Sequence, residues 1–185
     1  MGEIEDAIER ADREAFTRQP PKTLQARINF LIKQLKTTKA VAAELGVSQR
    51  SVERYRKGER KHPPKNITAK IDDAVRQRWQ PQVRKRRRKQ AATATGITVE
   101  TRARFGYTAP IGTTDDGRFR RLTVHLPPAY AQRLFDARNT GASDQQMRGI
   151  IAEGFREIYF QDGGSRALGL SDVTLNDIDY LDLDY

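Results

Sequence analysis

The sequence predicts a mainly α-helical fold with a small β element, arranged as an N-terminal helical domain and a C-terminal α+β domain. Apolar residues recur every three or four positions through most of the first 80 residues, which is the period of amphipathic helices. Residues 119–126 alternate, with Leu122, Val124 and Leu126 on one face, a pattern typical of a half-buried strand. Proline and glycine separate these patterns and set the expected ends of the elements.

Five helices are expected before residue 81. They cover about 2–16, 24–35, 38–45, 48–57 and 67–79, with Pro or Gly between them except before 38–45, where Thr37-Thr38 offers a helix cap. In the last of them Ile67, Ile71, Val75 and Trp79 recur every four residues. This period favours packing of Trp79 in the core, although stacking on an unpaired base is the alternative.

The second half combines strands and helices. Residues 98–108 have strand composition, TTDDG at 113–117 predicts a hairpin turn, and 119–126 alternates. One helix is expected from Pro127–Pro128 to about Arg138, and a second from the Ser143 cap to about Phe160. The predicted organisation is a helical domain at 1–81, a basic linker at 82–96 that is helical at its start, a β-hairpin and helix-helix domain at 97–162, and an acidic tail at 163–185.

Positive charge is concentrated in the first half of the chain. The 185 residues have a formal net charge of +10, with 24 basic and 11 acidic residues up to Thr95 and 10 and 13 beyond it. Residues 22–89 alone have a net charge of +16, and 162–185 have −5. A basic segment of this density predicts an anionic partner, and nucleic acid is the simplest one.

The composition argues against several other classes. The chain has no cysteine, so disulfides and cysteine-based zinc sites or nucleophiles are excluded. Two histidines, His62 and His125, are too few for a His-rich metal site, and no metal or cofactor of its own is expected. The sequence contains no run of eighteen apolar residues, so no membrane span is predicted. The first residues are charged throughout, which is unlike a secretory signal.

Residues 38–58, TKAVAAELGVSQRSVERYRKG, have the spacing of two short helices that meet at an angle. Ala42 lets the helices approach, Gly46 tolerates a left-handed turn, and Ser48 can satisfy free N–H groups at the start of the second helix. The segment resembles the helix-turn-helix of bacterial DNA-binding proteins, whose second helix enters the major groove. The alternative is a helical hairpin with a basic face that is only solvated.

On the DNA-binding interpretation, residues in and after the second helix contact DNA. Gln can pair bidentately with adenine and Arg with guanine, while the cations that follow meet phosphates. The predicted DNA-binding residues are Ser48, Gln49, Arg50, Ser51, Arg54, Arg56, Lys57, Arg60 and Lys61.

Six consecutive cations follow at 84–89. A run of this kind repels itself and can track a phosphate backbone through counterion release. It also resembles a nuclear import signal. The predicted DNA-binding residues here are Arg84, Lys85, Arg86, Arg87, Arg88 and Lys89.

Residues 121–160 resemble a ribbon-helix-helix module, on the basis of an alternating strand, a proline helix start, Gly141 and the Ser143 cap. Such modules dimerise by pairing their strands, and a polar strand face can read the major groove. Here that face is Arg121, Thr123 and His125. Because this half of the chain is net acidic, dimerisation or packing of a local sheet is the plainer interpretation.

The sequence contains no enzyme constellation, because neither histidine has an evident nucleophile partner and no Gly-rich phosphate loop is present. The overall layout instead resembles the Tpg-type telomere terminal proteins of linear bacterial chromosomes and plasmids. The resemblance rests on KTTKAVAAELGVSQRSVERYRKGERKHPPKNI and RFGYTAPIGTTDDGRFRRLTVHLP and extends over nearly the whole chain.

This resemblance implies a protein that binds telomeric DNA and primes end-patching DNA synthesis. A threonine hydroxyl receives the first deoxynucleotide and remains bonded to the DNA 5′ end, while a partner polymerase supplies Mg²⁺ and the catalysis. The resemblance implies that Thr114 is this acceptor, with Thr113 as second choice. The alternative is that both threonines only shape a turn. The implied partners are telomeric DNA with its single-stranded 3′ overhang, a DNA polymerase, a telomere-associated accessory protein and a second copy of the chain, with no membrane.

Two other functions fit the motifs. One is a dimeric, sequence-specific transcriptional regulator, and the other is a plasmid partition or recombination adaptor. The terminal-protein interpretation places the chain in the cytoplasm, on the nucleoid at chromosome or plasmid ends.

Overall fold

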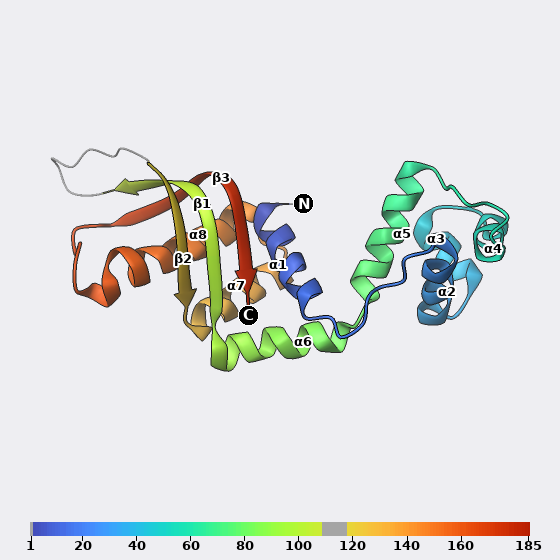
Figure 1. Cartoon of the computed structure of the whole chain (residues 1–185), viewed down its shortest axis with the longest axis horizontal. Helices are drawn as coiled ribbons and strands as arrows, with labels where there is room; N and C mark the ends of the chain where they lie inside the picture. The colour runs from blue at the N-terminus through green and yellow to red at the C-terminus, as the bar shows by residue number, and fades with distance from the viewer. Residues whose placement is uncertain (1, 109–117) are drawn as a thin grey trace. The chain divides into compact units, whose positions relative to one another are not determined.

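The structure is a computed structural model that describes residues 2–108 and 118–185. The chain forms two compact units (Figure 1): the helical unit, Phe16–Pro81, and the sheet unit, Met1–Ala15 together with Gln82–Tyr185. Eight α-helices and three strands lie in the described residues, which confirms a mainly α fold with a small β element.

Four helices make up the helical unit, and their order and approximate bounds agree with the sequence prediction. They are α2 (Leu24–Leu35), α3 (Thr38–Leu45), α4 (Gln49–Lys57) and α5 (Lys65–Arg78). All four contribute to one apolar core. Its most buried members are Ile28, Leu31, Val41, Leu45, Val52, Tyr55 and Ile71.

Trp79 follows the last residue of α5 and is half-buried at the edge of the helical unit, so it packs on a neighbouring ring but does not lie in the core that its four-residue period predicted. Its ring meets Phe30 edge-on at 5.1 Å between centroids, and its indole N–H donates to the carbonyl of Arg18 at 3.1 Å. These contacts occupy both the ring and the polar end of the side chain, so they favour the packing interpretation over stacking on a base.

The turn between α3 and α4 has the geometry that its sequence requires. Gly46 has φ +68°, in the left-handed region where a residue with a Cβ is strained. Val47 then donates its N–H to the carbonyl of Ala42 at 3.0 Å, and Ser48 Oγ accepts the N–H of Ser51 at 3.2 Å. The predicted glycine turn and serine cap are therefore both present.

An antiparallel sheet with strand order β2-β1-β3 organises the other unit (Figure 1). Its elements are α1 (Glu3–Glu14), α6 (Pro81–Gln90), β1 (Ile97–Thr108), β2 (Arg118–Leu126), α7 (Pro128–Asn139), α8 (Asp144–Gly154) and β3 (Asp172–Asp184). Short turns of π or 3₁₀ helix follow α6 and α8, at Ala91–Thr95, Phe155–Phe160 and Asp162–Gly164. The predicted strand pair and the two following helices are confirmed.

One face of the sheet is apolar and packs on helices. The buried residues alternate along β1, where Val99 and Phe105 are examples, and along β2, where Leu122 and Val124 are examples. The Phe105 ring meets Phe155 edge-on at 5.4 Å. The opposite face carries the polar residues of the same strands, which is the usual pattern for an antiparallel sheet solvated on one side.

The first helix belongs to the sheet unit and not, as predicted, to the domain at 1–81. Ile4 and Ile8 of α1 are fully buried in the core of the sheet unit. Glu5 accepts a hydrogen bond from Arg138 Nε at 2.9 Å, which ties α1 to α7. The apolar stripe of α1 was visible in the sequence, but its partners lie more than 100 residues away, so no local pattern could assign it to a unit.

Residues 82–96 are not a free linker. Pro81–Gln90 forms α6 and Ala91–Thr95 continues it as a π-helical turn, with Ala91 fully buried. Arg84 and Arg88 lie one helical turn apart on the side that faces the sheet unit, and Arg88 forms an ion pair with Asp12 of α1. A buried carboxylate therefore offsets part of the repulsion within the six-cation run.

The predicted acidic tail at 163–185 is largely a strand. Residues 172–184 form β3 and pair with β1 from Thr98↔Asp184 to Thr108↔Asp172. Val173, Leu175, Leu181 and Leu183 are buried, so the aspartates between them lie on the solvated side or the edge. The alternation is interrupted near Asp177, where φ is +35° and the register shifts, and this interruption weakened the strand signal in the sequence.

Candidate nucleic-acid interface

Helix α4 has one buried and one exposed face. Val52 and Tyr55 are buried in the helical unit at 0% and 1% exposure. The exposed side chains recur at the spacing of one helical face and its flank. They are Gln49, Arg50, Glu53, Arg54, Arg56 and Lys57. The apolar residues thus hold the helix on its unit while the polar face remains open to a partner.

The two serines at the start of α4 bond to each other. Besides accepting the N–H of Ser51, Ser48 Oγ lies 2.9 Å from Ser51 Oγ. Ser48 is exposed and Ser51 is half-buried. Of the two predicted roles, helix capping is the one that these contacts establish, and the predicted DNA contacts of both hydroxyls stay a prediction.

Gln49 is held by two hydrogen bonds. Its Nε2 donates to Thr38 Oγ1 at 3.0 Å, across the turn to α3, and to Glu53 Oε1 at 3.1 Å, one turn along α4. A carboxylate can only accept, so the nitrogen of the amide must face Glu53. The predicted bidentate contact of Gln49 with adenine needs one N–H of Nε2 as a donor, so at least one of these bonds would have to open.

Several cations in and after α4 have no acidic partner. Arg50, Arg56 and Lys61 are exposed and form no ion pair with any described residue. Arg54 and Lys57 lie 3.8 and 3.9 Å from the exposed Glu59, distances at which an ion pair contributes little. The guanidinium of Arg60 lies 5.8 Å from the centroid of the Tyr55 ring.

The six-cation run divides into two sets on α6. Arg84 and Arg88 are half-buried, and burial lowers the pKa of the Arg84 guanidinium. Burial also disfavours the charge of Arg88, but the hydrogen bond and the negative charge of Asp12 raise its pKa above the ordinary value. The exposed set is Lys85, Arg86, Arg87 and Lys89.

The Asp12 carboxylate joins α1, α6 and the chain's C-terminal residue. Asp12 is 1% exposed, accepts a hydrogen bond from Arg88 Nε at 3.1 Å, and accepts another from the Tyr185 hydroxyl at 2.7 Å. Burial and the neighbouring carboxylate raise the pKa of Tyr185 above 10, so the phenol stays a donor. Neither Asp12 nor Tyr185 was predicted as a site residue, because each lies far in sequence from the cation it serves.

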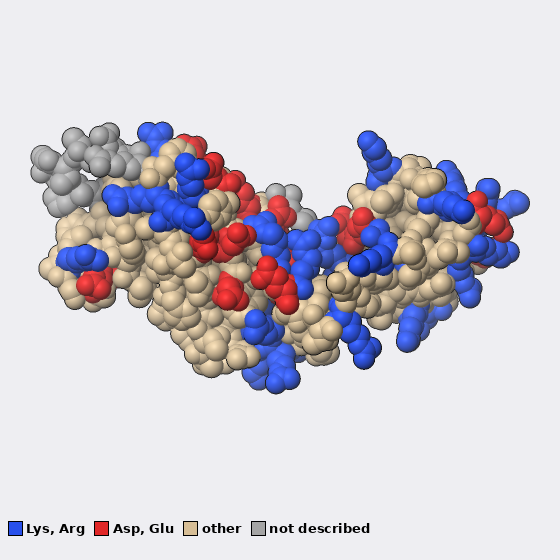
Figure 2. Space-filling view, in the orientation of Figure 1, with Lys and Arg blue, Asp and Glu red and all other residues tan. Residues whose placement is uncertain are grey.

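Most of the described arginines elsewhere in the sheet unit are paired with carboxylates. These pairs include Arg10–Asp182, Arg102–Asp179, Arg121–Glu100, Arg133–Glu153, Arg138–Glu5 and Arg148–Asp144. On the face drawn in Figure 2, blue and red atoms alternate over the sheet unit, whereas blue atoms predominate over the helical unit. Unpaired positive charge is therefore found mainly on the helical unit, where α4 and its following loop carry part of it, and on the exposed side of α6.

The polar face of β2 is less suited to DNA than its residue types predicted. Arg121 Nη2 donates to Glu100 Oε1 at 2.6 Å, and this bond lowers the pKa of Glu100. His125 Nδ1 lies 3.1 Å from Thr98 Oγ1, while Thr123 is exposed. The charge of Arg121 is thus neutralised by a neighbour on β1, which supports a packing role for this module.

Thr113 and Thr114, the predicted acceptor residues, lie outside the described residues. The described strands that flank them pair antiparallel, and the register extends to Phe105↔Arg118. In the sequence, both threonines lie between β1 and β2.

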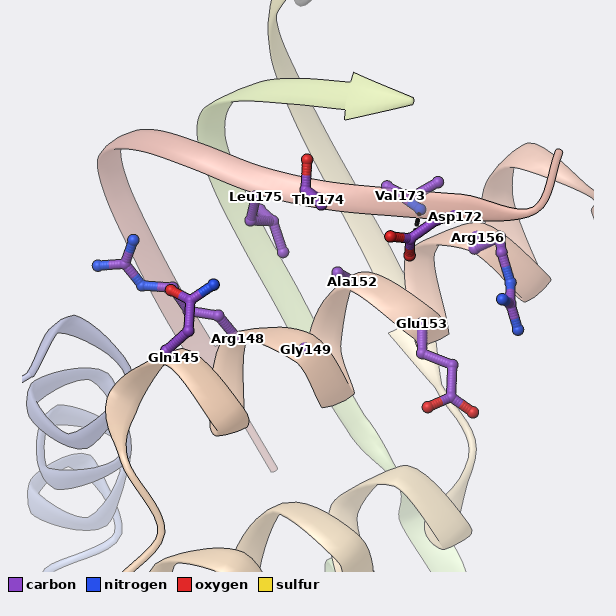
Figure 3. A pocket seen from close by; sticks show the side chains of 10 residues that line it. All are labelled: Gln145, Arg148, Gly149, Ala152, Glu153, Arg156, Asp172, Val173, Thr174 and Leu175. Atoms are coloured by element: carbon purple, nitrogen blue, oxygen red, sulfur yellow. Dashed lines mark hydrogen bonds between the residues drawn. The ribbon is translucent and has the colours of Figure 1, made fainter. Parts of the chain in front are cut away.

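A shallow pocket of about 260 Å³ lies between α8 and β3 in the sheet unit (Figure 3). Gly149 and Ala152 lie between two arginines, Arg148 and Arg156. Arg148 bonds Asp144 at 3.0 Å, and Arg156 lies 3.3 Å from Glu157 and donates to the Ser171 carbonyl. The two cations that line this pocket are therefore engaged by groups of the chain itself, unlike Arg50 of α4.

Two further observations concern other kinds of site. Within 2–108 and 118–185, no group of three or more His, Asp or Glu side chains is placed to hold a metal ion. No helix of this described part is long and apolar enough to cross a membrane.

Comparisons with known proteins identify no relative of this chain. No family model, curated protein or solved structure matches it. The resemblance to Tpg-type terminal proteins therefore rests on the sequence motifs alone, and the functional argument rests on the residues described above.

Proposed function

We propose that this chain binds double-stranded DNA through α4, which enters the major groove, and that α6 adds a second contact with phosphates. One observation carries the proposal: a capped helix, fixed by a glycine turn to α3, presents a row of exposed cations with little or no acidic neutralisation. Helix-turn-helix proteins use their second helix in this way. The exposed cations of α6 would add binding energy without sequence preference.

Within that activity, we propose that the chain serves as a telomere terminal protein. The support is the resemblance stated above and the location of Thr113 and Thr114 in the segment that connects β1 to β2. The chain would act as an acceptor and not as the catalyst, on the nucleoid at chromosome or plasmid ends. Its partners would be telomeric DNA with a 3′ overhang, an accessory telomere protein and a DNA polymerase with Mg²⁺.

The proposed priming step is a nucleotidyl transfer. The oxygen of Thr114 attacks the α-phosphorus of a deoxynucleoside triphosphate, a new O–P bond forms, and pyrophosphate leaves. The hydroxyl proton is lost to solvent or to a polymerase group. Because a threonine hydroxyl is not acidic, the polymerase's metal ions must activate it. No side chain of this chain needs to act as a base.

The other candidate is a dimeric transcriptional regulator or plasmid partition adaptor. The observation that favours it is the position of β2 at an edge of the sheet, followed directly by α7 and α8 with a capping box at Ser143. A sheet edge can pair with the same strand of a second copy, which would bring two helical units to one DNA site. Under this alternative Thr114 has no chemical role.

A labelling experiment separates these functions. The chain is incubated with a polymerase and accessory protein from a linear replicon, telomeric DNA, Mg²⁺ and a labelled deoxynucleotide. Thr114→Ala should abolish labelling while DNA binding is retained, and Thr114→Ser should keep part of it. If Thr114→Ala is fully labelled and Thr113→Ala is not, the acceptor is Thr113. If the wild-type chain binds DNA but is never labelled, the regulator function is favoured.

A further inference from the structure

Glu53 is the one carboxylate on α4, and it lies on the exposed face that the proposed function directs at DNA. It is one helical turn after Gln49 and accepts a hydrogen bond from that amide at 3.1 Å. This bond uses one carboxylate oxygen, Oε1, and leaves Oε2 available as an acceptor. Glu53 is thus an acceptor held in position among donors.

Glu53 has cations at helical spacing on both sides but forms an ion pair with neither of them. Arg50 precedes it by three residues and Lys57 follows it by four, both spacings at which helical side chains can meet. Yet Glu53 forms no ion pair with any described residue, whereas Lys57 lies 3.9 Å from Glu59. The carboxylate is therefore neither buried nor neutralised, and its partner in the helical unit is an amide.

A carboxylate on this face cannot contact phosphates, because the two charges repel each other. It can, however, accept a hydrogen bond from an amino group on a base edge in the major groove. Only cytosine N4 and adenine N6 offer such a group there. Adenine also presents N7, an acceptor beside N6 that repels a carboxylate, while cytosine presents no acceptor beside N4.

We propose that Glu53 is a specificity-determining residue that accepts a hydrogen bond from cytosine N4. The proposal rests on the proposed binding of duplex DNA by α4. The guanine of the same or the next base pair presents O6 and N7, which suit the guanidinium of Arg50 or Arg54. Glu53 thus offers an acceptor to the amino group of cytosine, while the neighbouring arginines offer donors to the acceptors of guanine.

Gln49 has a positioning role in this arrangement. Its amide bridges Thr38 of α3 and Glu53 of α4, at 3.0 and 3.1 Å, and so fixes the carboxylate relative to the turn. A fixed acceptor discriminates between bases better than a mobile one, because less side-chain freedom is lost on binding. Gln49→Ala should therefore weaken the cytosine preference without replacing it by another.

The test is selection from a randomised duplex library at one salt concentration, followed by affinities for the selected site and its single-base variants. Four full-length chains are compared: wild type, Glu53→Ala, Glu53→Gln and Glu59→Gln. The last removes the same charge from an exposed position of the helical unit and serves as the matched control. Thermal unfolding checks that all four are folded.

The wild type and Glu59→Gln should select a site in which one position prefers cytosine by about tenfold. Glu53→Ala should lose that preference while all other positions keep theirs, and Glu53→Gln should shift it towards adenine. A cytosine preference that survives Glu53→Ala would overturn the role of Glu53 and leave DNA binding by α4 intact. Failure of the wild type to select any sequence would overturn both this role and the proposed sequence-specific binding.

Discussion

The helical unit contains 16 basic and 5 acidic residues, whereas the sheet unit contains 18 basic and 19 acidic residues. The numbers of cations are similar, but their environments differ. In the sheet unit most arginines outside α6 pair with carboxylates of other elements, as Arg138 does with Glu5 and Arg148 with Glu3. In the helical unit the cations of α4 remain exposed. The two units therefore differ in how their cations are paired and not in how many cations they contain.

Helix α6 contains both kinds of cation within one element. Arg88 forms an ion pair with the buried carboxylate of Asp12, while Arg86 and Arg87 are exposed. The same residue type therefore stabilises the unit at one position and is available to a partner at the next. Substitutions on α6 separate paired from exposed cations most clearly, because the paired and the exposed arginines have the same charge and side-chain length and lie on the same helix.

Arg88→Ala should have the largest effect on stability. It leaves Asp12 buried without its cation, and breaking a buried ion pair in this way costs about 3–5 kcal/mol. Arg87→Ala, on the neighbouring exposed position, should change the free energy of unfolding by no more than about 0.5 kcal/mol. Denaturant unfolding of both variants measures this difference. Equal losses in both would show that α6 is not anchored through Asp12.

Removing the exposed charges of α6 should weaken DNA binding and leave the stability of the fold nearly unchanged. With Lys85, Arg86, Arg87 and Lys89 replaced by Gln, the chain should stay folded and bind all DNA sequences more weakly. The slope of log affinity against log salt should fall by about 0.9 for each duplex phosphate that α6 no longer neutralises. Affinities at several salt concentrations give the slope. A slope equal to that of the wild type would remove α6 from the interface.

Tyr185→Phe should lower the free energy of unfolding less than Arg88→Ala does, and the size of the loss should depend on pH. The hydroxyl donates to buried Asp12, and leaving that acceptor short of a donor costs about 1–3 kcal/mol. Since the folded-state pKa of Tyr185 is raised above its ordinary value of 10.0, its contribution is present below pH 10 and is lost as pH rises through the folded-state pKa.

Unfolding measurements on both chains between pH 8 and pH 11 check this expectation. The wild type should lose more stability above about pH 10 than Tyr185→Phe does. Parallel curves for the two chains would mean that the hydroxyl of Tyr185 does not contribute through Asp12.

The sequence predicted those features that depend on neighbours along the chain. The turn at Gly46, the Ser48 cap and the buried Val52 all lie within a few residues of one another, so their pattern identified α3 and α4. The β1–β2 pair and the helix cap at Ser143 are local in the same sense.

The features that sequence reasoning missed depend on distant partners. The division of the cations of α6 depends on Asp12, which is 76 residues from Arg88. β3 was taken for a tail because Asp177 and Asp179 interrupt its alternation, and its partner strand begins 75 residues earlier in the chain. Glu53 was overlooked because a lone acid in a basic helix has no local motif, and only its bond with Gln49 marks it.

The most direct test of the central claim compares Arg50→Ala with Arg121→Ala. Both remove one exposed arginine, but Arg50 has no ion pair with a described residue and Arg121 bonds Glu100. On a selected duplex at fixed salt, Arg50→Ala should cost about 1–3 kcal/mol and relax specificity at one base pair. Arg121→Ala should leave both affinity and specificity nearly unchanged. Equal losses in the two variants, or a larger loss for Arg121→Ala, would contradict DNA recognition by α4.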